Sequence, residues 1–263
     1  MKILFISFYY TPDYCAGSFR AKSIYTSLLK EPRVEKCFVY TTIPHRYGYV
    51  HDSKTFKQYK RDRITKFKVP HHQNKFLKQI ITFIVFAFKT FFTSLKNKNE
   101  IDLVLVTSSR FGTALLGYVI SVFIKKPLAL DIRDIFSDSL ISIDNKSTLI
   151  KIIAGVVKKL ESLILTHANW VNFVSPGFLP YFQKLNLDNP RIYTNGIDNI
   201  FLEKKIHKVN DNNLKNKNLF NIVYAGNIGF GQGLESIIIP LAKTFNDKIS
   251  FTIIGDGSAK NIL

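Results

Sequence analysis

The sequence is poor in cysteine and lacks the common metal and nucleotide motifs. Its two cysteines, Cys15 and Cys37, are too few for a disulfide framework or a zinc site, which favours a reducing compartment. No Asp-x-Asp occurs, and only His71 and His72 are adjacent among the six histidines. The apolar start is short and lacks a small-residue cleavage site, so it predicts a first strand and not a signal peptide.

Acidic residues are also scarce. The chain has 37 Lys and Arg against 19 Asp and Glu, which gives a net charge of +18. Between His45 and Asn99, 13 basic residues stand against two acids, Asp52 and Asp62. Such a block predicts an anionic partner, either a membrane surface, a nucleic acid or a phosphorylated substrate. A solubilising face is the alternative. The hydrophobic content of 46% indicates a folded protein.

Two apolar runs near the end of the chain lead into glycine turns. Phe220 to Ala225 is followed by glycines and a helix pattern from Leu234, and Ile249 to Ile254 is followed by Gly-Asp-Gly. Glycine turns and helix N-termini present backbone N–H groups to phosphates, and α/β sheets bind ligands at the carboxyl ends of their strands. The spacing does not fit G-x-G-x-x-G or G-x-x-x-x-G-K-[ST]. The pattern therefore suggests a nucleotide-diphosphate site, with tight turns alone as the alternative.

The remaining chain alternates apolar runs with helical patterns. The predicted strands are Lys2 to Ser7, Lys36 to Thr42, Asp102 to Thr107, Pro127 to Ile132, Trp170 to Val174 and Arg191 to Thr194. The predicted helices are Phe19 to Lys30, Lys75 to Lys96, Gly112 to Ile124 and Ser147 to Leu165. The segment from Ile43 to Pro70 is predicted to be a long loop with little regular structure.

The helix from Lys75 to Lys96 is amphipathic. On a helical projection, one narrow sector contains Lys75, Lys78, Thr82, Lys89, Thr93 and Lys96. The far side contains Leu77, Ile80, Ile81, Ile84, Phe88, Phe91, Phe92 and Leu95, and Phe86 departs from this pattern. A lysine stripe is costly inside a bilayer, so an interfacial helix on an anionic membrane surface is favoured over a membrane span. A helix that packs its apolar face on the sheet is the alternative.

Charged residues gather near predicted strand ends. Asp131, Arg133, Asp134 and Asp138 follow one strand, at the edge where α/β sites lie. The alternative is that these acids cap turns and pair with Arg133. Arg20 lies near a helix N-terminus, where a cation is poorly placed for the dipole, so an anionic ligand would account for it. A salt bridge is the alternative for Arg20.

Five patches in order resemble the family-4 glycosyltransferases, two-domain GT-B enzymes, in the branch that builds bacterial surface polysaccharides. They are the loop with Gly17 and Arg20, Leu-Asp-Ile-Arg-Asp-Ile-Phe, Asn-Gly-Ile-Asp from Asn195, Val-Tyr-Ala-Gly-Asn-Ile-Gly with Gln-Gly-Leu-Glu, and Ile-Ile-Gly-Asp-Gly. Two positions depart from the family pattern. Arg133 stands where many members have His, and Gln232 stands at a Lys-like position, so backbone and helix end must supply more of the charge stabilisation.

The resemblance implies an α/β, GT-B-like fold. We expect a Rossmann-like N-terminal domain with a parallel sheet over 1–206, a linker over 207–218 and the start of a second Rossmann-like domain over 219–263. The family's Glu-x7-Glu segment is missing, so the chain is expected to be truncated within that domain. We expect residues 1–198 to fold stably and residues 220–263 to be only loosely ordered, because so small a segment buries little surface.

The resemblance also implies the activity. We expect a retaining transfer of a sugar from a nucleotide diphosphate sugar to a polyprenyl-linked glycan precursor, at the cytoplasmic face of the membrane and without a metal cofactor. Asp134 is the expected catalytic residue, and the acceptor side would comprise Gly17, Arg20, Ser109 and Arg133. The donor would contact Gly226, Asn227, Gly229, Gln232, Gly233, Gly255 and Gly257. The membrane would contact Lys75, Lys78, Lys89 and Lys96.

Two other readings of function stay open. The first is a non-catalytic remnant that binds membrane or acceptor but has no complete donor site. The second is nucleic-acid binding, which rests on charge alone and predicts steep salt dependence. Because no nucleic-acid motif is recognised, no nucleic-acid partner is expected.

Overall fold

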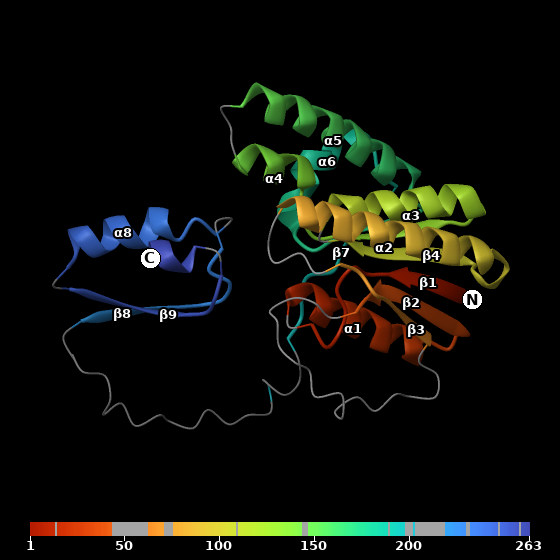
Figure 1. Ribbon diagram of the computed structural model, residues 1–263, viewed down its shortest axis with the longest axis horizontal. Coiled ribbons are helices and arrows are strands. Elements are labelled where there is room, and N and C mark those ends of the chain that lie inside the picture. Colours follow the sequence, from red (N-terminus) through yellow and green to blue (C-terminus); the bar gives the residue numbers. More distant parts are fainter. Residues whose placement is uncertain are drawn as a thin grey trace. The chain divides into compact units, whose positions relative to one another are not determined.

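The computed structural model describes residues 1–13, 15–43, 63–70, 76–108, 110–143, 147–188, 190–197, 202, 219–229, 232–246, 248–257 and 259–263. They form two compact units, Met1–Gly196 and Ile197–Leu263 (Figure 1). Each unit contains parallel strands and helices. The predicted α/β fold class is confirmed.

The first unit is built on a seven-stranded parallel sheet in the order β3-β2-β1-β4-β5-β6-β7. The strands are β1 (Lys2–Ile6), β2 (Lys36–Thr42), β3 (Arg63–Phe67), β4 (Leu103–Ser108), β5 (Leu128–Ile132), β6 (Trp170–Phe173) and β7 (Arg191–Ile192). The register pairs Ile3 of the central β1 with Cys37 on one side and Leu103 on the other. All five residues of β5 are buried, as expected of a parallel strand covered on both faces.

Helices lie on both faces of this sheet. They are α1 (Ala16–Lys30), α2 (Phe76–Lys96), α3 (Phe111–Ile124), α4 (Phe136–Ile143), α5 (Thr148–His167) and α6 (Leu179–Phe182), with the 3-10 turns η2 (Lys98–Glu100), η3 (Pro176–Phe178) and η4 (Gln183–Leu185). In Figure 1, α1 lies on one side of the sheet and α2, α3 and α5 lie on the other. Two apolar clusters form the core, one of them containing Ile3, Phe5 and Tyr25 and the other Leu4, Phe86 and Phe173.

Most predicted elements lie within one or two residues of the observed ones, with two clear exceptions. Helix α1 begins at Ala16, three residues before the predicted start. The prediction of a loop over 43–70 is wrong at Arg63–Phe67, which forms strand β3 at the edge of the sheet. Two residues of β3, Ile64 and Phe67, pack against the core, and both are only partly buried. An edge strand needs less apolar sequence than a central one.

Helix α2 turns a row of small polar residues and one aromatic ring toward the core. Its buried side consists of Thr82, Phe86, Thr90 and Ser94, each fully buried. Thr82 and Ser94 donate hydrogen bonds to carbonyls four residues earlier, at 2.7 Å each, so their hydroxyls are satisfied inside the sheet–helix interface. Phe86, the departure from the predicted pattern, is fully buried in the core, and Phe83 and Phe91 pack against the core beside it.

The predicted apolar side of α2 faces outward. Ile80, Ile81, Ile84, Phe88 and Phe92 are between 42% and 61% exposed. Phe91 and Leu95 of the same side pack against the core, so the alternative of a helix that packs its apolar side inward holds for part of this side only. Within the described residues, Lys78–Lys96 is the one stretch long and apolar enough to cross a membrane by length and composition.

The second unit contains β8 (Phe220–Ala225), α8 (Glu235–Thr244), β9 (Ile249–Ile254) and η7 (Lys260–Ile262). Strands β8 and β9 pair in parallel along their whole length, and both have the predicted bounds. The buried apolar residues here are Ile228, Leu234 and Ala259. Asn221, Val223 and Ala225 point to the same face of β8 and are all exposed, Val223 by 62%, so one face of this two-stranded sheet is open.

Candidate functional site

A buried carboxylate organises the carboxyl end of the main sheet. Asp131 of β5 is 4% exposed. Its Oδ2 accepts hydrogen bonds from Arg20 Nε at 2.8 Å and Thr107 Oγ1 at 2.7 Å, and its Oδ1 accepts from Arg20 Nη2 and Asn172 Nδ2, both at 2.6 Å. The donors come from α1, β4 and β6. Each of the two carboxylate oxygens therefore accepts two hydrogen bonds from other side chains of the first unit.

Arg20 extends this network to the segment after β7. Its side chain is 10% exposed, and its remaining donors reach Tyr193 O at 2.9 Å, Thr194 O at 3.1 Å and Asn195 Oδ1 at 3.0 Å. The salt-bridge alternative for Arg20 is thus present in the structure, with Asp131 as the partner. An acceptor role for Arg20 stays a prediction, and it would require a ligand beside this network.

Sequence reasoning missed Thr107 and Asn172 and did not pair Arg20 with Asp131. The partners lie 111 residues apart in the chain, so local spacing carries no sign of the contact. One signal was available. Asn172 interrupts the apolar strand β6, and a buried polar side chain needs a hydrogen-bond partner.

Arg133 and Asp134 lie directly after β5. The Arg133 amide donates to Ser108 O at 3.1 Å, which ties this segment to the end of β4. Its Nε is buried and has no hydrogen-bond partner among the described residues. Burial lowers the pKa of Arg133, and the nearby carboxylates of Asp131 and Asp134 partly offset this effect.

Asp134 is exposed at the surface, yet partial desolvation of its carboxyl group raises its pKa, against an opposing effect of Arg133. A carboxylate with a raised pKa holds a proton more readily than a free aspartate does. A proton-acceptor role for Asp134 stays a prediction. Of the other predicted acceptor residues, Gly17 lies in the first turn of α1, and Ser109 lies outside the described residues.

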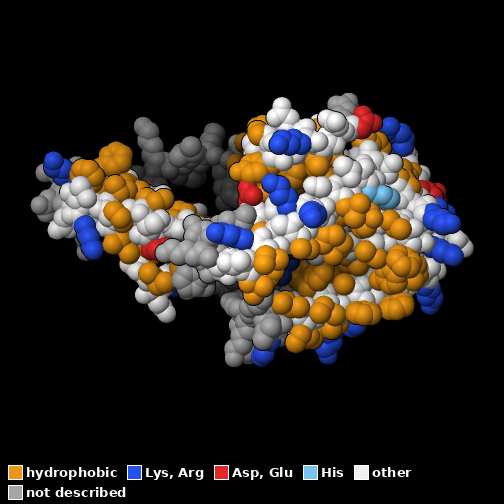
Figure 2. Space-filling view, turned by 90° about the horizontal axis from the view of Figure 1, so that it is seen from above, with side chains coloured by type: hydrophobic (Ala, Val, Ile, Leu, Met, Phe, Trp, Pro, Cys, Tyr) orange, Lys and Arg blue, Asp and Glu red, His pale blue; other side chains and the backbone are white. Residues whose placement is uncertain are grey.

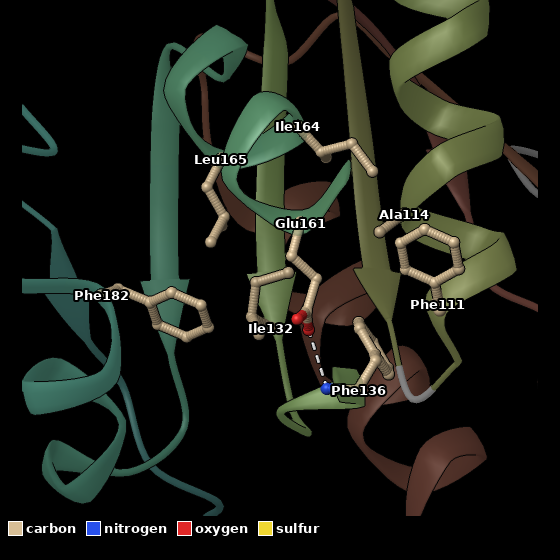
Figure 3. Close-up of a pocket in the computed structure, with 8 residues that line it drawn as sticks. All are labelled: Phe111, Ala114, Ile132, Phe136, Glu161, Ile164, Leu165 and Phe182. Carbon is tan, nitrogen blue, oxygen red and sulfur yellow. Dashed lines mark hydrogen bonds between the residues drawn. The ribbon is translucent and has the colours of Figure 1, made fainter. Parts of the chain in front are cut away.

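Glu161 of α5 holds the start of α4, which follows Asp134 in the chain. It is 5% exposed, and one of its carboxylate oxygens accepts from the Phe136 amide at 2.8 Å (Figure 3). The other accepts from the Ser137 amide at 3.3 Å. These amides begin α4, so Glu161 supplies the negative cap that the α4 N-terminus favours. The adjacent cavity is about 10 Å³ and apolar, which is a gap in the core and too small for a substrate.

In the second unit, the turns after β8 and β9 touch through their backbones. Gly226 N donates to Ile254 O, and Ile228 N donates to Asp256 O, both at 2.9 Å. A Cβ on Gly255 would lie 1.8 Å from Gly226 O, and one on Gly257 would lie 2.1 Å from Ile228 O. Glycine is therefore required at both positions for the turns to meet.

Gln232 closes the first turn. Its Oε1 accepts from Asn227 Nδ2 at 2.8 Å and from Gly229 N at 3.0 Å. Two donors thus converge on one oxygen, which is the arrangement that a phosphate oxygen would also satisfy. Gly233 has a φ of +59°, in the left-handed region that favours glycine, and precedes α8. Donor binding by these residues stays a prediction.

The predicted membrane residues lie on α2. Lys78, Lys89 and Lys96 are exposed, and Lys75 lies outside the described residues. Lys89 Nζ donates to Lys68 O at 2.8 Å. Among the described residues, no group of three or more His, Cys, Asp or Glu side chains is placed to hold a metal ion.

Solved structures share this fold. No protein-family model and no curated protein matches the sequence. The chain is similar to Anabaena HepE in complex with UDP, with a TM-score of 0.59 and 16% identity over 98% of this chain and 62% of that one. It is similar to sucrose-phosphate synthase from Thermosynechococcus elongatus, with a TM-score of 0.62 and 14% identity over 96% and 62%.

A third neighbour is the lipopolysaccharide outer core galactosyltransferase WaaB, with a TM-score of 0.50 and 15% identity over 100% of this chain and 63% of that one. These neighbours are GT-B glycosyltransferases, and the chain shares the GT-B fold. It spans about three fifths of their length.

Proposed function

We propose that the chain belongs to a retaining glycosyltransferase of the family-4, surface-polysaccharide type. It transfers a sugar from a nucleotide diphosphate sugar to a lipid-linked glycan precursor, at the cytoplasmic face of the membrane and without a metal cofactor. The bond between the sugar C1 and the diphosphate oxygen breaks, and a bond forms between C1 and an acceptor hydroxyl oxygen. The acceptor proton passes to Asp134, and the nucleotide diphosphate leaves.

The pair of touching glycine turns after β8 and β9 carries this proposal. These turns lie at adjacent strand ends, where α/β folds bind ligands, and the first of them leads into the N-terminus of α8. The fold is shared with HepE, which has been solved with UDP and with UDP-glucose. Backbone donors there would stabilise the charge that develops on the leaving diphosphate.

Calorimetry with UDP and UDP-glucose tests the donor half of the proposal. The 263-residue chain should bind at least one of them, and Gly255→Val should abolish binding because its side chain would collide with the Gly226 carbonyl. Gly155→Val is the matched control, since nothing lies within 4 Å of a Cβ at that position. Binding by Gly255→Val equal to that of the wild type would contradict the assigned donor site.

A second candidate function is a non-catalytic protein that binds membrane or acceptor. The observation in its favour is that Gln232 already occupies the Gly229 amide, so the donor turn is closed on itself. The same calorimetry separates the two candidates. Absence of binding to any nucleotide diphosphate sugar, with the chain folded, would favour this second function.

A further inference from the structure

The outward side of α2 continues onto α3. Ile81, Ile84, Phe88 and Phe92 of α2 are exposed, and so are Val122 and Phe123 of α3, at 44% and 64%. We call these six residues the apolar face. The two helices pack together, and the Phe91 ring meets the Phe123 ring edge-on with a centroid distance of 5.2 Å. Figure 2 shows apolar side chains gathered on this side of the first unit, with basic side chains along the margin.

Helix α2 cannot leave the sheet to cross a bilayer without dismantling the core. Phe86 is fully buried and contacts the rings of Phe8 and Phe67 at centroid distances of 5.2 Å and 6.1 Å. The exposed apolar residues of α2 therefore form part of the protein surface, and the helix does not span a membrane. Contiguous exposed apolar surface of this kind marks an interaction site.

A basic groove adjoins the apolar face. It is open, has a volume of about 460 Å³ and is lined by Ser121, Val122, Lys125, Lys126, Pro127, His167 and Asn169. Val122 belongs to both surfaces, so the groove and the apolar face are continuous. Lys125 adopts a left-handed conformation (φ 54°) as the C-cap of α3, and it lines the groove beside Lys126.

The charge of α2 and α3 distinguishes two partners that could cover the apolar face, a second copy of the chain and an acidic phospholipid surface. Helices α2 and α3 contain no Asp or Glu, and α2 contains Lys78, Lys89 and Lys96. A second copy of the chain docked symmetrically on this face would bring lysines against lysines. An acidic phospholipid surface instead supplies anionic headgroups to the lysines and an apolar layer to the aromatic rings.

We propose that the apolar face inserts into the boundary between headgroups and acyl chains of an acidic bilayer, while Lys125 and Lys126 contact lipid phosphates from the groove. This inference deepens the proposed function, because a transferase with a lipid-linked acceptor works at a membrane. The prediction made on sequence assigned membrane contact to Lys75, Lys78, Lys89 and Lys96 of this helix, and the inference adds the exposed rings and the two lysines of the groove. Its test needs no sugar transfer.

Flotation of the 263-residue chain with vesicles tests the proposal. The wild type should bind phosphatidylcholine vesicles weakly and vesicles that also contain phosphatidylglycerol more tightly. Phe88→Ser with Phe92→Ser should lower binding to both vesicle types roughly tenfold or more, because the rings no longer insert. Lys125→Gln with Lys126→Gln should lower binding to acidic vesicles about tenfold and leave neutral vesicles unaffected.

Matched controls lie on α1, on the other side of the sheet. Phe19→Ser changes a ring that is 48% exposed, and Lys22→Gln with Lys30→Gln changes two exposed lysines. Both should bind vesicles like the wild type. Phe88→Trp gives a second measurement that does not depend on a weakened variant. Its emission should shift to shorter wavelength on vesicles and be quenched by brominated acyl chains.

Three results would overturn the proposal. They are a wild type that binds neither vesicle, a Phe88/Phe92 variant that binds as well as the wild type, and a dimer in solution that this variant dissociates, since a second copy would then cover the face. UDP binding without vesicle binding would overturn this inference alone. Vesicle binding without binding of any donor would overturn the donor half of the proposed function alone.

Discussion

Side chains hold together the strand ends of the first unit, whereas backbone holds together those of the second. In the first unit, Asp131 is buried and saturated by donors from three other elements. In the second, glycines let two turns approach until their amides and carbonyls bond directly. A side-chain network is rigid and vulnerable to the loss of one charge, while a backbone contact depends on the absence of a Cβ. The strand ends of the first unit should therefore be disrupted by removal of a charge, and those of the second unit by addition of a side chain to a glycine.

Asp131→Asn should have the largest effect on stability. It leaves the Arg20 guanidinium buried without its counter-charge, which typically costs about 3–5 kcal/mol of the free energy of unfolding. Urea unfolding followed by circular dichroism measures this. Asp134→Asn is the control in the same segment, and it should stay within about 0.5 kcal/mol of the wild type because its side chain is exposed. Equal stability of the two variants would show that the Asp131 network contributes little.

Hydrogen exchange compares the two units directly. We expect amides of β8 to exchange several hundredfold faster than amides of β1, because β8 pairs on one side only and one of its faces is open. Exchange detected by mass spectrometry or NMR gives both rates in one sample. Strong protection of Ile222 to Ala225, matching that of Ile3 to Ile6, would refute the expectation that the second unit is loosely ordered.

Asp134→Asn should lower turnover roughly a hundredfold while leaving donor affinity nearly unchanged, because it removes a proton acceptor and no donor contact. The measurement is steady-state transfer beside UDP calorimetry, in a version of the protein that transfers sugar. Asp138→Asn, four residues on in the first turn of α4, serves as the control. Normal turnover in Asp134→Asn would make Asp134 a turn residue only.

The raised pKa of Asp134 also predicts a sign for the pH dependence of stability. The folded chain holds this proton to higher pH than the unfolded chain, so the contribution of Asp134 to stability falls as pH rises between the unfolded and folded pKa values. Asp134→Asn should therefore be slightly more stable relative to the wild type at neutral pH than in acid. Unfolding curves at both pH values check the direction, and the opposite sign would indicate a lowered pKa.

Gln232→Ala should have the smallest effect, about a threefold to tenfold change in UDP affinity, the range of one or two hydrogen bonds. A fall in affinity would support Gln232 as a donor contact. A rise would mean instead that its side chain competes with phosphate for the Gly229 amide. Ser236→Ala, in α8, is a control that leaves both Gln232 contacts in place.

The sequence by itself determined the order of the elements and the position of most of them. Runs rich in aromatic and β-branched residues marked β2, β8 and β9 to the residue, because such residues are enriched in strands and turn residues bound the runs. Glycines marked the turns after β8 and β9, since a missing Cβ is visible in the sequence. Strand β3 escaped notice because an edge strand carries a weaker apolar signal.

Only the tertiary structure decided which groups meet. Arg20 and Asp131 are remote in sequence, and only the sheet order brings α1 beside β5. Periodicity placed Ile81, Ile84 and Phe88 on one side of α2, but it could not say which side meets the sheet. The hydroxyls of Thr82 and Ser94 donate hydrogen bonds within the helix, so the burial of these residues costs little free energy. This side of α2 can therefore meet the sheet while Ile81, Ile84 and Phe88 face outward. Helical spacing records which residues share a face, and the packing of the sheet decides which face is covered.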